Sequence, residues 1–191
     1  MNHDIDYQFD RHLKCIHQIR TDNNIQDQIM NSIEMMVQCY REKGKILFAG
    51  NGGSAADAEH LAAELSGKFN MDRNPLFAEA LHVNSAALSA ISNDYDFHTA
   101  YARILESKAS KPDVLVAIST SGRSKNIIEC INKAKTIGLN VIGISGQSTS
   151  PFKEICDIHI VIPSKDTARI QEASMLIGHI HTCFLYPGSI L

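Results

Sequence analysis

The sequence predicts an α/β protein with a mainly parallel five-stranded sheet between two layers of helices, a doubly wound three-layer sandwich preceded by N-terminal helices. Three observations support this fold class. After residue 44, short apolar runs alternate with segments of helical spacing. The strongest run, DVLVAIS at residues 113–119, is almost continuously apolar, which is typical of strands buried on both faces. Residues 1–43 show helical spacing alone.

The N-terminal segment, residues 1–43, is expected to form two helices. Apolar residues recur at helical spacing over residues 5–16 and again over residues 25–40. The polar stretch 21–24 separates the two runs and offers N-caps for the second helix, and Gly44 suits its C-cap. One small sheet cannot cover both apolar faces, so we expect part of them to pack on another subunit.

The α/β core is expected over residues 44–186, and with the N-terminal segment it forms a single domain over residues 1–191. Strands are predicted at residues 45–50, 77–82, 113–119, 140–145 and 157–163. Helices are predicted at residues 54–67, 83–92, 96–107, 124–137 and 166–185, with Pro187–Gly188 as the final stop. Five strands in this order suggest a flavodoxin-like sandwich.

Composition excludes several classes of function. The formal charge is −3 with no basic block, which argues against nucleic-acid binding. No apolar run approaches the ~20 residues that span a bilayer, and the start of the chain does not resemble a signal peptide. The five cysteines are scattered without a CxxC pair, which indicates free thiols in a reducing cytoplasm.

Two strand-to-helix turns are candidates for binding a phosphate monoester. They are Gly50-Asn51-Gly52-Gly53-Ser54 and Ser119-Thr120-Ser121-Gly122-Arg123-Ser124. Glycines allow the backbone to approach a ligand, and helix N-termini offer free N–H groups with a partial positive charge. Either turn alone is equally consistent with ordinary turns and N-caps, but the second favours an anion. Neither has the spacing of a dinucleotide-binding loop or a P-loop.

Two further pairs of residues can bind metal or move protons. His60 and Glu64 are four residues apart and share a helix face, and Gln171 and His179 lie in the last predicted helix. Taken alone, the first pair also fits a surface ion pair, and His179 also fits a core histidine. Sequence spacing does not show that the two helices meet.

The combination of these residues carries a family resemblance. GNGGSAADAEHLAAELSG, SND at residues 92–94, STSGRS, and RIQE at residues 169–172 followed by His179 resemble the sugar isomerase (SIS) fold, and within it the phosphoheptose (sedoheptulose 7-phosphate) isomerases. The resemblance covers about residues 44–182, whereas STSG alone would indicate only the wider SIS group. Lys68 and Arg123 depart from the residues common in the family.

The resemblance implies roles for named residues. It implies one zinc ion per subunit, held by His60, Glu64, Gln171 and His179. It implies substrate binding by Asn51, Gly52, Gly53, Ser54, Glu64, Asn93, Asp94, Ser119, Thr120, Ser121, Ser124 and Gln171. It also implies proton transfer by Glu64 and His179, a homotetramer with sites near the subunit interfaces, and no organic cofactor.

The expected reaction converts sedoheptulose 7-phosphate to D-glycero-D-manno-heptose 7-phosphate through an enediol, with Glu64 as base and His179 as partner acid. The resemblance places this step at the start of nucleotide-activated heptose biosynthesis for lipopolysaccharide, capsule or a related glycan. Two points are in tension with these roles: zinc weakens Glu64 as a base, and Gln171 and His179 lie ~12 Å apart along a helix.

Two alternatives remain at this stage. One is another aldose–ketose isomerase acting on a shorter phosphosugar. The other is a non-catalytic SIS protein that binds a replication initiator, which Glu64, Gln171 and His179 argue against.

Overall fold

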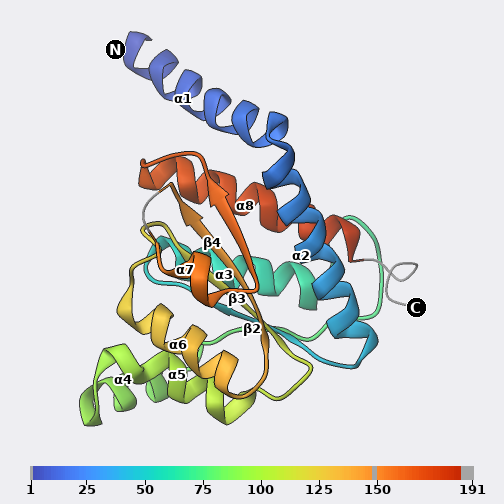
Figure 1. The fold of residues 1–191 in the computed structure, drawn as a ribbon, viewed down its shortest axis with the longest axis vertical. Coiled ribbons are helices and arrows are strands. Elements are labelled where there is room, and N and C mark those ends of the chain that lie inside the picture. The colour runs from blue at the N-terminus through green and yellow to red at the C-terminus, as the bar shows by residue number, and fades with distance from the viewer. Residues whose placement is uncertain (1, 148–149, 186–191) are drawn as a thin grey trace.

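The computed structural model describes residues 2–147 and 150–185 and confirms the doubly wound sandwich (Figure 1). In this part of the chain, five strands form one sheet in the order β2-β1-β3-β4-β5, and every neighbouring pair is parallel. The strands are β1 (Ile46–Ala49), β2 (Ala78–Ala80), β3 (Val114–Ser119), β4 (Asn140–Gly146) and β5 (Ile158–Ile162). This is the flavodoxin-like order that the sequence suggested.

The helices also follow the predicted order, with one addition. They are α1 (Asn2–Thr21), α2 (Asn23–Arg41), α3 (Gly53–Ser66), α4 (Ser85–Asp94), α5 (Phe97–Lys108), α6 (Lys125–Thr136), α7 (Phe152–Ile155) and α8 (Thr167–Phe184). The short helix α7 was not predicted. The expected stop at Pro187–Gly188 lies outside the described residues. None of the described helices combines the length and apolar character needed to cross a membrane.

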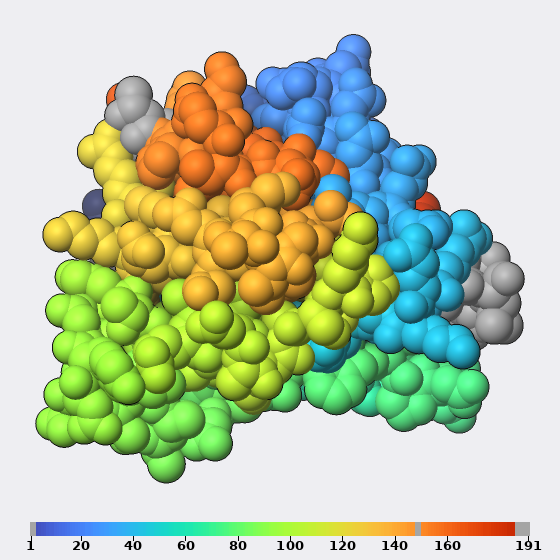
Figure 2. Space-filling model, turned by 60° about the horizontal axis from the view of Figure 1, so that its bottom comes forward, coloured from blue at the N-terminus to red at the C-terminus, as the bar shows by residue number. Residues whose placement is uncertain are grey.

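Strand side chains alternate between two apolar clusters, one on each face of the sheet. Ile46 and Phe48 of β1 join the cluster that includes α1, α2, α3 and α8. Leu47 and Ala49 join the cluster on the other face, with α5, α6 and α7. Figure 2 shows this second layer, where the green surface of α4 and α5 adjoins the yellow-orange surface of α6. Burial on both faces explains why the strands are almost continuously apolar.

The two ends of α2 are set by local hydrogen bonds. Asp22 is the N-cap and accepts hydrogen bonds from the backbone N–H groups of Asn24 and Ile25, at 2.9 and 3.2 Å. At the other end the left-handed residue is Lys43, with φ 63°, and not Gly44 as expected. Gly44 is needed there for a different reason, because a Cβ on it would lie 2.7 Å from the Cys39 Sγ.

Helix α1 extends beyond the body of the subunit (Figure 1). The ion pair Arg11–Asp166 at 2.5 Å joins it to the residue before α8, and the hydrogen bond between His12 Nδ1 and Glu172 Oε2 at 2.7 Å joins it to α8. Four large apolar side chains of α1 are left exposed: Ile5, Tyr7, Phe9 and Leu13. The N-terminal half of α1 therefore presents an apolar surface that the rest of the subunit does not cover.

Candidate active site

The two glycine- and serine-rich turns meet at the carboxyl edge of the sheet. They follow β1 and β3, which are adjacent parallel strands, so both open on the same side. The Asn51 Nδ2 donates a hydrogen bond to the Asn126 Oδ1 at 2.9 Å, and the Asn126 Nδ2 donates to the Asn51 Oδ1 at 2.8 Å. This reciprocal amide pair joins the first turn to the start of α6.

The backbone conformation favours glycine in both turns. Gly52 has φ 55° and Gly122 has φ 61°, a left-handed conformation that side chains disfavour. In the second turn, the Ser119 Oγ lies 3.2 Å from the Ser124 Oγ and accepts a hydrogen bond from the Gly122 N–H at 3.1 Å. The hydroxyls are thus gathered around the N-terminus of α6.

A cavity of about 490 Å³ opens beside the second turn. Its wall includes Thr120 and Ser121 from the turn, Ser164 from the connection before α8, and Thr167 at the start of α8. Two cationic residues, Arg123 and Lys165, also line it. Hydroxyls and cations beside a helix N-terminus suit a phosphate group.

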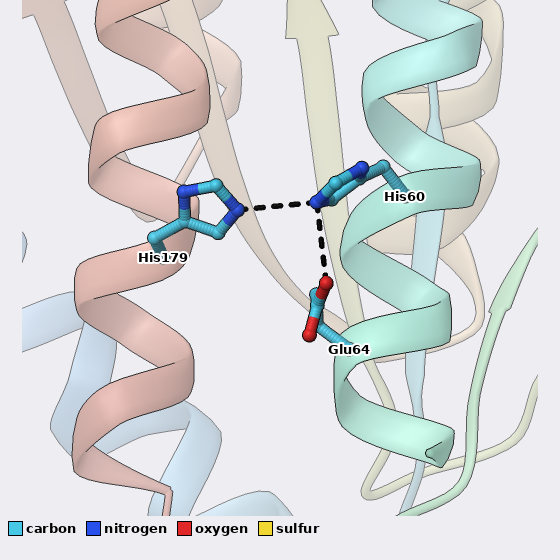
Figure 3. Close-up of side chains that lie close together, drawn as sticks. All are labelled: His60, Glu64 and His179. Atoms are coloured by element: carbon cyan, nitrogen blue, oxygen red, sulfur yellow. Dashed lines mark hydrogen bonds and ion pairs between the residues drawn. The ribbon is translucent and has the colours of Figure 1, made fainter. Parts of the chain in front are cut away.

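The second part of the site joins α3 and α8, which pack side by side in one layer. A Cβ on Gly178 would overlap the Leu61 side chain, so this glycine allows the two helices to approach. Figure 3 shows the result: His60 and Glu64 from α3 face His179 from α8. The His60 Nε2 lies 3.2 Å from the His179 Nε2 and 3.3 Å from the Glu64 Oε1.

The geometry of these three side chains fits a divalent metal. Their ligand atoms all lie within 4.8 Å of one another. Tetrahedral zinc with ligands at ~2.0–2.1 Å separates any two of them by about 3.3 Å, close to the two distances seen here. Two imidazoles and a carboxylate are also a donor set that zinc favours. We refer to His60, Glu64 and His179 below as the triad.

Gln171 is not part of the triad in this structure. Its side-chain amide lies against Gly53, where a Cβ would overlap it, at the N-terminal end of α3. Along α8 it is ~12 Å from His179. The structure therefore brings three of the four expected metal ligands together and places Gln171 beside the first turn.

Asn93 and Asp94 lie at the exposed end of α4, where the Asn93 Nδ2 donates to the Asp94 Oδ1 at 2.9 Å. Helix α4 belongs to the layer on the opposite face of the sheet from α3 and α8. Within one subunit, these two residues are separated from the triad by the sheet.

Asp57 is a partly buried acidic residue beside His60 that the sequence interpretation did not single out. It lies on α3, and its Oδ2 is buried without a hydrogen-bond partner in the described part of the chain. Burial raises the pKa of this carboxyl to about 6, and the nearby His60 opposes the rise. The signal was present in the sequence, because Asp57 precedes His60 by three residues and Glu64 by seven, which places it on their helix face.

Comparisons with known proteins identify the family of this chain. Residues 9–146 match the model of the SIS domain family. A phosphoheptose isomerase of Campylobacter jejuni is 46% identical over 155 residues, covering 81% of this chain and 83% of that protein. A phosphoheptose isomerase of Clostridium acetobutylicum is 42% identical over 180 residues, covering 94% of this chain and 92% of that protein.

Solved structures of phosphoheptose isomerases have the same fold as this chain. The phosphoheptose isomerase of Neisseria gonorrhoeae superposes with a TM-score of 0.89 at 34% identity, over 96% of this chain and 97% of that one. The enzyme of Francisella tularensis superposes with a TM-score of 0.90 at 30% identity, over 95% of both chains. The chain therefore belongs to the phosphoheptose isomerases of the SIS-domain family.

Proposed function

We propose that this protein converts sedoheptulose 7-phosphate to D-glycero-D-manno-heptose 7-phosphate. The observation that carries the proposal is the convergence of the triad from α3 and α8, with the first glycine-rich turn at the N-terminus of the same helix α3. His60 lies ~10 Å along α3 from Gly53 in the first turn. A sugar of seven carbons in an extended form bridges a gap of this order, with its phosphate at the turns and its carbonyl at the triad.

The phosphate end is assigned to the two turns. In the first turn, at the N-terminus of α3, the proposed phosphate contacts are the backbone of Asn51, Gly52 and Gly53 and the hydroxyl of Ser54. In the second turn the proposed contacts are Ser119, Thr120, Ser121 and Ser124. Binding energy from this remote group fixes the reacting carbons beside the triad.

At the other end, Glu64 takes the proton from C1 of the ketose, while His179 donates a proton to the carbonyl oxygen at C2. The product of this step is the enediol. Loss of the proton on the C1 oxygen and return of a proton to C2 give the aldose, so no oxidant or reductant is needed. Proton transfers by positioned groups contribute ~10²–10⁴-fold each to such reactions.

The triad would hold one zinc ion per subunit, as its donor set and spacing support. Bound there, zinc would supply charge stabilisation at the sugar oxygens. Gln171 remains a proposed fourth ligand and substrate contact, and to ligate it would have to leave its position against Gly53. Glu64 has two oxygens, so one remains for proton transfer if the other binds metal.

We further propose a homotetramer. The exposed apolar residues of α1 offer a surface for another subunit, and Asn93 and Asp94 would then serve the site of a neighbouring subunit. The free cysteines support a cytoplasmic location. In that setting the reaction opens nucleotide-activated heptose biosynthesis, for lipopolysaccharide, capsule or a related glycan.

The test is incubation with sedoheptulose 7-phosphate followed by product NMR, beside five- and six-carbon ketose phosphates at equal concentration. We expect the heptose product, with the seven-carbon substrate turned over fastest. A preference for a shorter sugar would support another phosphosugar isomerase. No turnover, together with capture of a replication initiator in a pull-down, would support the non-catalytic alternative.

A further inference from the structure

The connection between α3 and β2, residues 67–77, folds back over the C-terminal end of α3. This end matters because α3 stops at Ser66, which leaves Glu64 in the last turn. The last carbonyls of a helix have no partner within it, and terminal turns fray unless other groups satisfy them. Glu64, the proposed base, therefore lies in the turn of α3 that is most prone to fraying.

Arg73 donates hydrogen bonds to two carbonyls of the last turn of α3, and the Leu65 carbonyl also accepts one from the Leu76 N–H at 3.1 Å. Its Nη2 donates to the Glu64 carbonyl at 3.1 Å, and its Nη1 donates to the Leu65 carbonyl at 2.8 Å. The same Nη1 lies 3.2 Å from the Asn74 carbonyl within the connection. One planar guanidinium thus binds two successive carbonyls of the last turn. Its positive charge interacts favourably with the negative, C-terminal end of the helix dipole.

The same connection also reaches the α8 half of the site. The Phe69 ring stacks on the His179 imidazole, with ring centroids 5.5 Å apart and an interplanar angle of 16°. The next residue, Asn70, directs its Nδ2 at the Cys183 Sγ, at 3.5 Å. Cys183 follows His179 by one turn of α8. The connection therefore touches α8 as well as α3.

We propose that Arg73 and Phe69 are positioning residues, which fix Glu64 and His179 at the spacing that metal binding and proton transfer require. Arg73 acts through the backbone of Glu64, and Phe69 acts through the ring of His179. The proposal rests on the proposed function for its kinetic part, because it assigns a supporting role at that same site. Groups that orient metal ligands in this way change metal affinity or activity by about 10- to 100-fold when removed.

The experiment compares Arg73→Ala, Arg73→Lys, Phe69→Leu and Phe69→Tyr with the wild-type protein. Arg41→Ala is the matched control, since Arg41 is an exposed arginine in the last turn of α2. Each protein is stripped of metal and titrated with Co²⁺ alone, whose visible absorption reports ligand geometry. The turnover of sedoheptulose 7-phosphate is then measured with zinc restored.

We expect Arg73→Ala and Phe69→Leu to weaken Co²⁺ binding, alter its spectrum and lower kcat by about 10- to 100-fold, with KM changed less than about threefold. Arg73→Lys should recover part of the loss, since an ammonium reaches one carbonyl at a time. Phe69→Tyr, which keeps the ring, should recover most of it. The control should match wild type.

Wild-type kcat and Co²⁺ spectra in Arg73→Ala and Phe69→Leu would overturn the proposal, as would a change limited to melting temperature or an equal change in Arg41→Ala. If Arg73→Ala does not fold, the kcat values and Co²⁺ spectra of Phe69→Leu and Arg73→Lys test the proposal instead. If the wild-type protein does not turn over the sugar, the proposed function fails, while the Co²⁺ titrations still test the positioning role.

Discussion

The Nε2 atoms of His60 and His179 lie 3.2 Å apart, although the two histidines are 119 positions apart in the chain. They meet because α3 and α8 follow different strands yet cover the same face of the sheet. The Glu64 Oε1 lies 3.3 Å from the same His60 nitrogen. One N–H on His60 cannot serve both neighbours, whereas one cation between the three groups can.

Zinc binding should depend on this arrangement. Metal analysis of the purified protein is expected to give about one zinc per subunit, and His60→Gln should lower this strongly because it removes the central nitrogen. Chelation should reduce the melting temperature. Zinc at 1,000 times its Kd adds about 4 kcal/mol to the free energy of unfolding, and chelation removes this contribution. His17→Gln, an exposed histidine of α1, is the control. Equal zinc content in His60→Gln and wild type would count against a metal at the triad.

The amide pair between Asn51 and Asn126 should matter for phosphate binding. Asn126→Ala leaves Asn51 without its partner and frees the first turn. We expect a higher KM for the sugar phosphate, by about tenfold, and a stability loss of about 1–3 kcal/mol because Asn126 is buried. Urea unfolding and steady-state kinetics measure the two effects. Asn132→Ala on the exposed side of α6 is the control, and an unchanged KM in Asn126→Ala would contradict the role.

His181 should make stability depend on pH. It is a buried residue of α8 that faces α2, where its Nε2 lies 2.8 Å from the Ser32 Oγ. Burial lowers its pKa from 6.5 to about 4. Below pH 6.5 the unfolded chain binds a proton that the folded chain does not, so stability should fall as pH drops from 6.5 towards 4, by up to roughly 1.4 kcal/mol per pH unit.

His181→Gln tests this expectation, because glutamine does not titrate. The free energy of unfolding of the variant should lie below that of wild type at pH 7.5, and the gap should narrow at pH 5. A gap of constant size over this range would show that His181 has no part in the pH dependence.

Assembly should depend on α1. Phe9 and Leu13 are 63% and 62% exposed on the helix that extends from the subunit body. The double substitution Phe9→Glu and Leu13→Glu places two charges on this surface, and we expect a smaller species by light scattering coupled to size-exclusion chromatography. Lys14→Glu, on the same helix but outside the apolar stripe, should leave the mass of the wild-type assembly unchanged. A double variant with wild-type mass would place the interface elsewhere.

Much of the fold could be predicted from the sequence because its physics is local. The strand within DVLVAIS is buried on both faces and therefore appears in the sequence as a short, continuous apolar run, whose length favours a strand over a helix. The N-cap Asp22 and the break between α1 and α2 follow from side-chain chemistry. Helix α7, with four residues, is too short to show periodicity. The left-handed conformation falls on Lys43, and Gly44 is instead crowded against Cys39, a tertiary contact that is not visible in the sequence.

The site was less predictable, because it depends on contacts between distant segments. His60 and Glu64 share a helix face by spacing alone, but their meeting with His179 was implied only by the family resemblance. The spacing of eight residues already indicated that Gln171 and His179 would be far apart on α8, and in the structure Gln171 lies against Gly53. Asp57 shares the helix face of His60, yet its buried, unpartnered oxygen is a property of packing. The Asn51–Asn126 pair likewise needs the tertiary fold.

The most direct test of the account is the rate at which Glu64→Gln and His179→Gln convert sedoheptulose 7-phosphate in D₂O, followed by ¹H NMR. The wild-type protein should form the heptose phosphate with deuterium at C2, because the enediol takes its proton from exchangeable sites. Both variants should lose about 10²–10⁴-fold in kcat while remaining folded. Turnover in Glu64→Gln within a few-fold of wild type would contradict the assignment of the triad as the catalytic centre.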